Sequence, residues 1–144
     1  MKRLFALVLA LIMCLSLFAC GTDDKDDKDN KNNKANSEIE EYMEDHGDEL
    51  IDAMEEAFAK SSGMTCKSSY EVKGNELILE ICINELEDVD NDIKKQMQDA
   101  YDDMQYIWDA SLEEMQRELD ALEKLTVRVC EKDGTLLAEV SAGK

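Results

Sequence analysis

The sequence predicts an α+β domain in which an N-terminal helix and a long second helix cover one face of a four-stranded antiparallel sheet. We expect the sheet to consist of two hairpins, so that the order of elements is α-ββ-α-ββ. The spacing of apolar residues supports this order, because it changes twice from a helical period to strict alternation. Two hairpin turn signals support it as well, Gly74-Asn75 and Asp133-Gly134.

The first helix is predicted over residues 37–62. Ser37 is a favourable N-cap residue, and Glu40 three positions later completes a capping-box pattern. Gly47 interrupts the apolar face and is expected to kink or split the helix, whereas Gly63 is expected to end it in a left-handed conformation. The face with helical spacing contains Ile39, Tyr42, Met43, His46, Leu50, Met54, Ala57 and Phe58.

The first hairpin follows over residues 65–83. A Gly-Asn turn pairs Lys73 with Glu76, and this register places the apolar residues of both strands on the same side of the sheet. Its expected pairs are Val72 with Leu77, Tyr70 with Leu79 and Cys66 with Ile83. In the same register Cys66 and Cys82 point to opposite faces, which disfavours a disulfide between them.

Residues 86–123 show the longest helical pattern, and their acidic start complements the helix dipole. A single helix of this length would span ~55 Å, whereas an eight-residue strand covers only ~27 Å. The helix must therefore overhang the sheet, break, or also pack on the first helix. Its apolar positions are Val89, Ile93, Met97, Ala100, Met104, Trp108, Leu112, Met115, Leu119 and Leu122.

The second hairpin is predicted around Asp133-Gly134, with Lys132 paired to Thr135. This register sets Val129 opposite Ala138 and Val127 opposite Val140. It also places Ile78 and Leu137 on the face that the helices leave uncovered, where we expect a small exposed apolar patch.

The N-terminus has the pattern of a bacterial lipoprotein signal peptide. Two basic residues precede an uncharged segment, and Leu17-Phe18-Ala19-Cys20 resembles a lipobox. We expect cleavage before Cys20 and attachment of diacylglycerol to its thiol, because two acyl chains anchor a protein stably. The alternatives are a signal peptide cleaved without lipid attachment and an uncleaved anchor. An uncleaved anchor would have only about 16 apolar residues, whereas a membrane-spanning helix needs about 20.

These features divide the chain into three parts. Residues 1–19 form the signal peptide, residues 20–36 contain the lipidated cysteine and a tether, and residues 37–144 form a single α+β domain. The tether is rich in Asp, Lys and Asn and nearly devoid of apolar residues, so we expect it to be disordered. A flexible coil of this length spans ~20–25 Å, which keeps the domain close to the extracytoplasmic face of the cell membrane.

The strong acidity of the chain restricts its partners. The net charge is −19, and removal of residues 1–19, with Lys2 and Arg3 and no acid, makes it −21. Nucleic-acid binding is excluded on this ground, because it requires Lys and Arg to replace the counterions of the phosphates.

Five cysteines are present, of which Cys14 leaves with the signal peptide and Cys20 takes the lipid. An odd number then remains, with at most one internal disulfide, and no CxxC spacing indicates a zinc site. Cys82 and Cys130 share the uncovered face of the predicted sheet. A disulfide can join them only if the second and third strands are neighbours, and the alternative is that both are free thiols.

Other metal patterns are weak. Residues 88–92, DVDND, begin like a calcium-binding EF-hand loop, but its sixth and twelfth places hold Ile93 and Asp99 instead of Gly and Glu. We interpret them as the acidic start of a helix. The soft ligands Met54, Met97, Met104 and Met115 lie on apolar stripes, where methionine fills the core. We therefore expect neither a metal nor a cofactor.

The sequence also lacks the pattern of an enzyme. Its single histidine, His46, lies in an acidic helix, and no nucleophile elbow surrounds a serine or cysteine. We expect no catalytic residues.

Two segments carry a resemblance to a known family, Ser69–Leu77 in the first hairpin and Lys132–Thr135 before the last strand. Together with the long acidic helix, they make residues 37–141 similar to a family of short lipoproteins of unknown function from Gram-positive, clostridia-like bacteria. The resemblance implies the fold and no activity, and the three remaining cysteines belong to none of its motifs.

These observations favour a membrane-anchored, non-catalytic binding or interaction module, held by the lipid on Cys20, with an unknown protein or small-molecule partner. A structural surface protein that self-associates through the long helix is the alternative. A metal carrier or an enzyme is the third and least favoured class.

Overall fold

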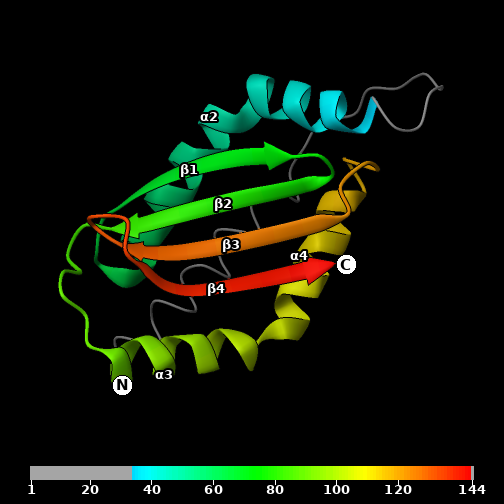
Figure 1. The fold of residues 1–144 in the computed structure, drawn as a ribbon. Coiled ribbons are helices and arrows are strands. Elements are labelled where there is room, and N and C mark those ends of the chain that lie inside the picture. Colours follow the sequence, from blue (N-terminus) through cyan, green and yellow to red (C-terminus); the bar gives the residue numbers. More distant parts are fainter. Residues whose placement is uncertain (1–33, 144) are drawn as a thin grey trace.

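The computed structural model describes residues 34–143. The predicted signal peptide, Cys20 and most of the predicted tether lie outside these residues. Within the described range no helix has the length and apolarity that crossing a membrane requires. The elements are α2 (Lys34–Ser62), β1 (Cys66–Lys73), β2 (Glu76–Ile83), α3 (Asn91–Asp102), α4 (Gln105–Gln116), β3 (Lys124–Glu131) and β4 (Leu136–Gly143) (Figure 1).

The four strands form one mixed sheet in the order β1-β2-β3-β4. Each hairpin is antiparallel, but β2 and β3 at the centre run parallel. The predicted antiparallel sheet, and with it the order α-ββ-α-ββ, is therefore wrong: the order is α-ββ-α-α-ββ. Parallel neighbours need a crossover of about a dozen residues or more, and the segment with α3 and α4 supplies it.

The register of the first hairpin is as predicted, with Val72 paired to Leu77. In the second hairpin Val129 pairs with Ala138 as predicted, but the pairing of Lys132 with Thr135 is wrong. The N–H of Glu131 donates to the carbonyl of Thr135, and a bulge pairs Cys130 with Leu136. The extra residue, Leu137, joins the core with 4% of its surface exposed. Ile78 is equally buried, so the predicted exposed patch of these two residues is wrong.

Helix α2 begins at Lys34, three residues before the predicted N-cap Ser37, and continues through Gly47 without a split. Gly47 instead lets β1 come close. A Cβ at this position would lie 2.6 Å from Cε1 of Tyr70, whose hydroxyl donates a hydrogen bond of 3.0 Å to the carbonyl of Met43. Gly63 ends the helix with a φ of +71°, as predicted.

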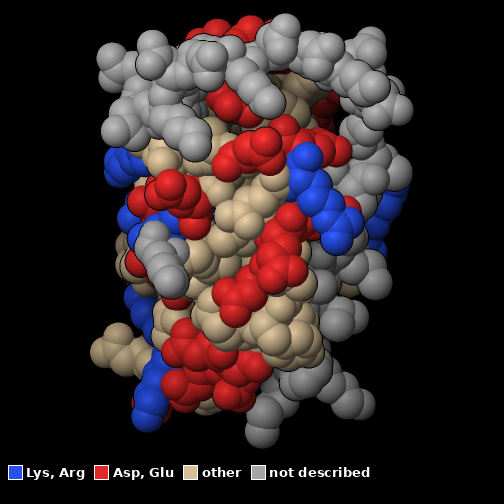
Figure 2. All heavy atoms as spheres, turned by 90° about the vertical axis from the view of Figure 1, so that its right-hand side faces the viewer, with Lys and Arg blue, Asp and Glu red and all other residues tan. Residues whose placement is uncertain are grey.

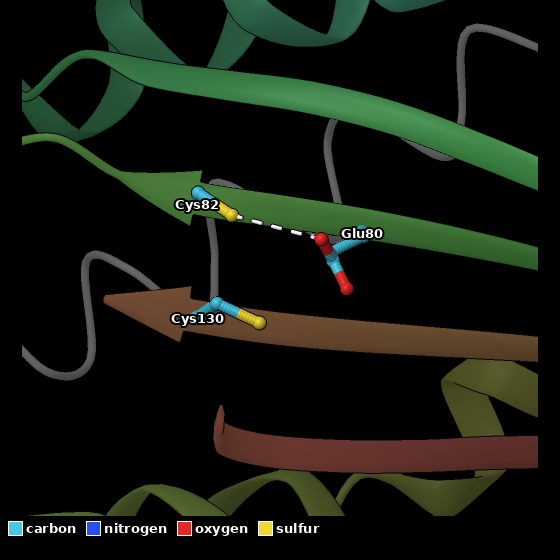
Figure 3. A group of neighbouring side chains, drawn as sticks. All are labelled: Glu80, Cys82 and Cys130. Atoms are coloured by element: carbon cyan, nitrogen blue, oxygen red, sulfur yellow. Dashed lines mark hydrogen bonds between the residues drawn. The ribbon is translucent and has the colours of Figure 1, made fainter. Parts of the chain in front are cut away.

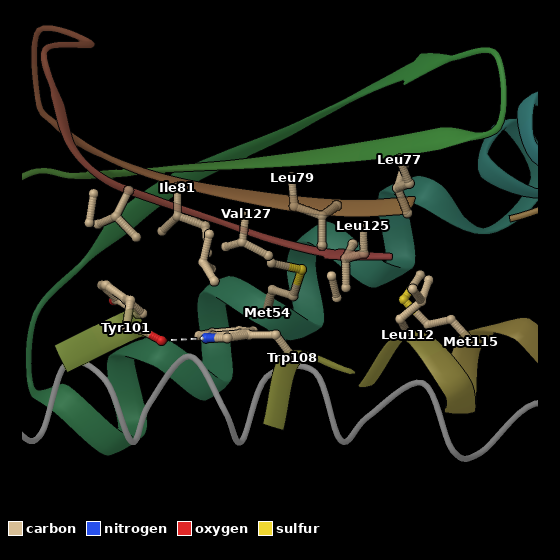
Figure 4. Close-up of a cluster of buried hydrophobic side chains, with 14 of the residues drawn as sticks. Met54, Leu77, Leu79, Ile81, Tyr101, Trp108, Leu112, Met115, Leu125 and Val127 are labelled. Atoms are coloured by element: carbon tan, nitrogen blue, oxygen red, sulfur yellow. Dashed lines mark hydrogen bonds between the residues drawn. The ribbon is translucent and has the colours of Figure 1, made fainter. Parts of the chain in front are cut away.

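The predicted long helix is broken after Asp102 into α3 and α4. A break is one of the three arrangements that the mismatch in length between helix and strand allows. The break contains neither Gly nor Pro. It is stabilised by Trp108 of α4, whose indole N–H donates to the carbonyl of Tyr101 over 3.2 Å (Figure 4). Both rings are buried, with centroids 5.7 Å apart. The break lets both helices follow the short sheet instead of overhanging it.

All three helices lie on the same face of the sheet, where they enclose one core (Figure 1, Figure 4). Helix α2 packs against β1, and α3 and α4 pack against β4. The core includes Leu77, Leu79 and Ile81 of β2 and Leu125, Val127 and Val129 of β3. Trp108, Tyr101 and Phe58 are its largest fully buried side chains.

Helical side chains also bind the two outer edges of the sheet. At β4, Gln98 accepts from the backbone N–H of Glu139 and donates to its carbonyl, with distances of 2.9 and 2.7 Å. Gln105 donates to the carbonyl of Ser141 over 2.8 Å. At β1, the carboxylate of Glu55 accepts from the backbone N–H of Ser68. These side chains occupy backbone groups that an edge strand otherwise presents to other chains.

One buried ion pair ties the end of β3 to α3. Glu131 has only 5% of its side chain exposed, lies 3.0 Å from the ammonium of Lys94 and accepts from the backbone N–H of Val89. The pair closes the end of the sheet where β2 leads into α3.

Candidate functional site

The side of the sheet that faces away from the helices is the candidate site, and we call it the open face. No described helix packs on it (Figure 1). Because side chains alternate along a strand, the residues between the core positions all project here. They are Lys67, Ser69, Glu71, Lys73, Glu76, Ile78, Glu80, Cys82, Lys124, Thr126, Arg128, Cys130, Glu139 and Ser141.

Hydrogen bonds connect three strands at one end of the open face. The hydroxyl of Thr126 donates to Glu76 over 2.6 Å and lies 2.8 Å from the hydroxyl of Ser141. Lys124 adds an ion pair of 3.2 Å to the same carboxylate. The hydrogen bond from Thr126, and then the charge of Lys124, lower the pKa of Glu76 below its usual value.

The middle of the open face contains a small hollow of about 130 Å³. Charges of both signs line it, from Glu71, Glu80 and Arg128, with Ile78 contributing apolar surface. Arg128 is opposite Glu80 in the register, yet its Nε donates to Glu139 over 2.6 Å. In the described part of the chain, the carboxylate of Glu80 consequently has no ion-pair partner.

Next to this hollow, the parallel pairing of β2 with β3 sets Cys82 directly beside Cys130. The two thiols and the Glu80 carboxylate lie within 4.8 Å of one another, and Sγ of Cys82 donates to Glu80 over 3.8 Å (Figure 3). Both cysteines are free thiols. The condition set for the disulfide, that the second and third strands are neighbours, is met, and the Cys82–Cys130 disulfide itself stays a prediction.

Burial controls the reactivity of these thiols. It raises the pKa of Cys130 to about 12, and the negative charge of Glu80 contributes to that rise. Burial raises the pKa of Cys82 as well, again with a contribution from Glu80. Both groups are therefore protonated at neutral pH, and protonated thiols are poor nucleophiles.

The other candidate ligands and nucleophiles lie apart from the open face. Cys66 is buried on the core side, where desolvation raises its pKa to about 11. His46 is exposed on α2, and its ring lies 4.8 Å from that of Tyr42. No hydrogen bond joins His46 to a cysteine within residues 34–143. Met54, Met97 and Met115 are buried core residues, and Met104 packs against them.

The acidic run at residues 88–92 is the start of a helix, as interpreted from the sequence. Asp90 is the N-cap of α3, and its carboxylate accepts from the backbone N–H of Ile93 over 2.9 Å. Asp92 lies in the first turn of that helix. Figure 2, which views the molecule from the right-hand side of Figure 1, shows Asp and Glu side chains spread over that face, so the acidic charge is not confined to this turn.

Comparisons with family models, curated proteins and solved structures find no match to this chain.

Proposed function

We propose that this chain is an extracytoplasmic lipoprotein, anchored in the cell membrane by diacylglycerol on Cys20. In this proposal the α+β domain binds a protein or small-molecule partner through the open face and performs no chemistry. The lipobox-like Leu17-Phe18-Ala19-Cys20 supports the anchor. The hollow beside Glu80 is the observation that carries the binding role. Membership in the lipoprotein family that the sequence resembles is part of the same proposal.

The hollow supports binding by its size and by its charges. About 130 Å³ holds a group of a few heavy atoms, such as one side chain of a protein partner or a small polar molecule. Carboxylates and a guanidinium line it, so a group that both donates and accepts hydrogen bonds is the best match. The surrounding open face offers four strands of polar surface around this anchor point.

Self-association through the long helical segment is the second candidate. The break between α3 and α4 buries most of the apolar positions of this segment, such as Trp108 and Met115, whereas Ile93 stays 39% exposed. The open face is therefore the larger candidate surface.

The anchor is tested by mass spectrometry of the protein isolated from membranes of its host. We expect a chain that begins at Cys20 and carries diacylglycerol, and a Cys20→Ala variant that lacks the lipid. A chain that begins at Met1, or at an unmodified Cys20, would exclude the anchor.

The binding role is tested separately by photocrosslinking in the host. A photoreactive amino acid in place of Glu71, which is exposed beside the hollow, should give an adduct that Arg128→Ala weakens. The matched control places the same amino acid at Tyr106, which is 70% exposed on α4 and far from the open face. Equal adduct yields at the two positions would exclude the open face as the binding surface. A yield at position 71 that Arg128→Ala leaves unchanged would exclude it as well.

A further inference from the structure

We propose that Cys82, Cys130 and Glu80 form a binding site for a thiophilic divalent cation such as Zn²⁺, with water as the fourth ligand. The site shares Glu80 with the hollow of the proposed binding surface, but it rests on other observations, namely the register of β2 with β3 and the distances between the ligand atoms. It revises the expectation of no metal that the sequence alone supported.

The strand pairing positions the ligands. Cys82 and Cys130 are register partners on parallel neighbours, and Glu80 precedes Cys82 by two residues, so all three side chains leave the same face. Figure 3 shows the two sulfur atoms and the carboxylate gathered over the junction of β2 and β3. These are the two central strands of the sheet, so the backbone that carries the ligands is held on both sides.

The distances suit a tetrahedral metal. Zinc binds sulfur at about 2.3 Å and carboxylate oxygen at about 2.0–2.2 Å, which sets tetrahedral ligand atoms about 3.5–3.8 Å apart. The three ligand atoms here lie within 4.8 Å of one another, and the Cys82–Glu80 pair is already at 3.8 Å. Small side-chain rotations would complete the site without moving the strands.

The electrostatics of the cluster favour a cation. Three groups that become negative on ionisation face one another, and Cys130 is only 1% exposed. Lys67 and Arg128 are the cations whose charges reach the thiols, and Arg128 is bound to Glu139 through its Nε. In the described residues, the only hydrogen bond to the Glu80 carboxylate comes from the thiol of Cys82. A divalent ion would satisfy all three groups at once.

Binding would proceed by proton exchange without any redox change. One M²⁺ and two thiols give two metal–sulfur bonds and release two protons, while the Glu80 carboxylate adds a metal–oxygen bond. Two thiolates favour Zn²⁺ or Cd²⁺ over the hard ions Ca²⁺ and Mg²⁺. A disulfide between Cys82 and Cys130 would require a two-electron oxidant and would remove the site.

The test is titration of the reduced, purified full chain with Co²⁺ as a spectroscopic probe, followed by displacement with Zn²⁺. We expect one ion per chain, a sulfur-to-cobalt charge-transfer band and release of two protons per Zn²⁺. Loss of a group that only hydrogen-bonds to a metal ligand weakens metal binding by about 10- to 100-fold. Cys82→Ser and Cys130→Ser each remove a ligand itself and should therefore weaken Zn²⁺ binding by a larger factor. Glu80→Gln should weaken it by a smaller factor.

Two controls make the result decisive. Cys66→Ala removes a thiol on the opposite face and should leave the charge-transfer band unchanged. Binding to the acidic surface alone would fade in high salt and ignore the cysteine variants. Absence of the band, variants without effect, or a Cys82–Cys130 disulfide in protein alkylated directly in its host would each overturn the proposal. If Cys130→Ser fails to fold by circular dichroism, the more exposed Cys82 and Glu80 variants decide.

Discussion

The contact between Gly47 and Tyr70 predicts a mutation whose effect changes sign with its background. On an exposed helix, Gly→Ala stabilises by about 1 kcal/mol. Here the new Cβ would lie 2.6 Å from Cε1 and 2.9 Å from Cζ of Tyr70, so the ring must move. Its hydroxyl is held by the carbonyl of Met43, one turn before Gly47 in the same helix.

The magnitude follows from three terms. Overpacking costs about 1–3 kcal/mol, and loss of the Tyr70 hydrogen bond costs about 1 kcal/mol. The gain in helix propensity offsets about 1 kcal/mol of this. We therefore expect Gly47→Ala to lower the free energy of unfolding by about 2 kcal/mol. With Tyr70→Ala already present, the same change should raise it by about 1 kcal/mol.

The assay is urea denaturation of the wild type, both single variants and the double variant, followed by circular dichroism. The denaturant dependence should be the same for all four proteins, so that the midpoints report stability. Stabilisation by Gly47→Ala in the wild-type background, or an equal effect in both backgrounds, would show that the α2–β1 contact is not as described.

Three further changes test other parts of the structure. The buried hydroxyl of Tyr101 has no hydrogen-bond partner among the described residues, so Tyr101→Phe should leave stability unchanged or raise it by about 1 kcal/mol in the same denaturation assay. Lys94→Met leaves the Glu131 charge buried and should cost about 3 kcal/mol, whereas Lys60→Met breaks an exposed pair and should cost less than about 0.5 kcal/mol. Similar losses for both would contradict the role of burial. The hydrogen bond from Thr126 lowers the pKa of Glu76 in the folded protein. The ionised Glu76 therefore stabilises the fold fully above its usual pKa of 4.5, and this stabilisation is lost as the pH falls through the lower folded-state pKa. Glu76→Gln should therefore be less stable than the wild type at neutral pH and nearly equal to it in acid, by denaturation at each pH.

Local patterns predicted the hairpins well, and their limits are physical. The Gly-Asn turn and the alternation of apolar residues determine the register of the first hairpin, so Val72 and Leu77 pair as expected. The Asp-Gly signal predicted a two-residue turn, whereas the loop contains residues 132–134 with Gly134 at a φ of +89°. The bulge at Leu137 compensates for the extra loop residue, so that Val129 still pairs with Ala138. The relative direction of the two hairpins depends on the path of residues 84–123, and no local pattern encodes that path. The apolar run of residues 77–83, interrupted only by Glu80, is the feature of the sequence that is typical of a strand with a parallel neighbour.

The cysteine cluster shows the same limit. Sequence reasoning placed Cys82 and Cys130 on one face but could not make them register partners, because that requires the parallel pairing of β2 with β3. Glu80 was missed because an alternating strand with one acidic residue is common. The helix break at residues 103–104 left no signal in the apolar spacing, and only the mismatch in length between helix and sheet indicated it.

The glutamines that bind the edge of β4 limit how copies of this domain can assemble. Growth of a sheet from molecule to molecule needs two receptive edges on each copy, one to add to and one to extend from. Gln98 and Gln105 occupy backbone groups along β4, and Glu55 occupies the N–H of Ser68 on β1. Addition of strands from other copies is therefore restricted at both edges of the sheet. The domain is in this way protected against fibre formation.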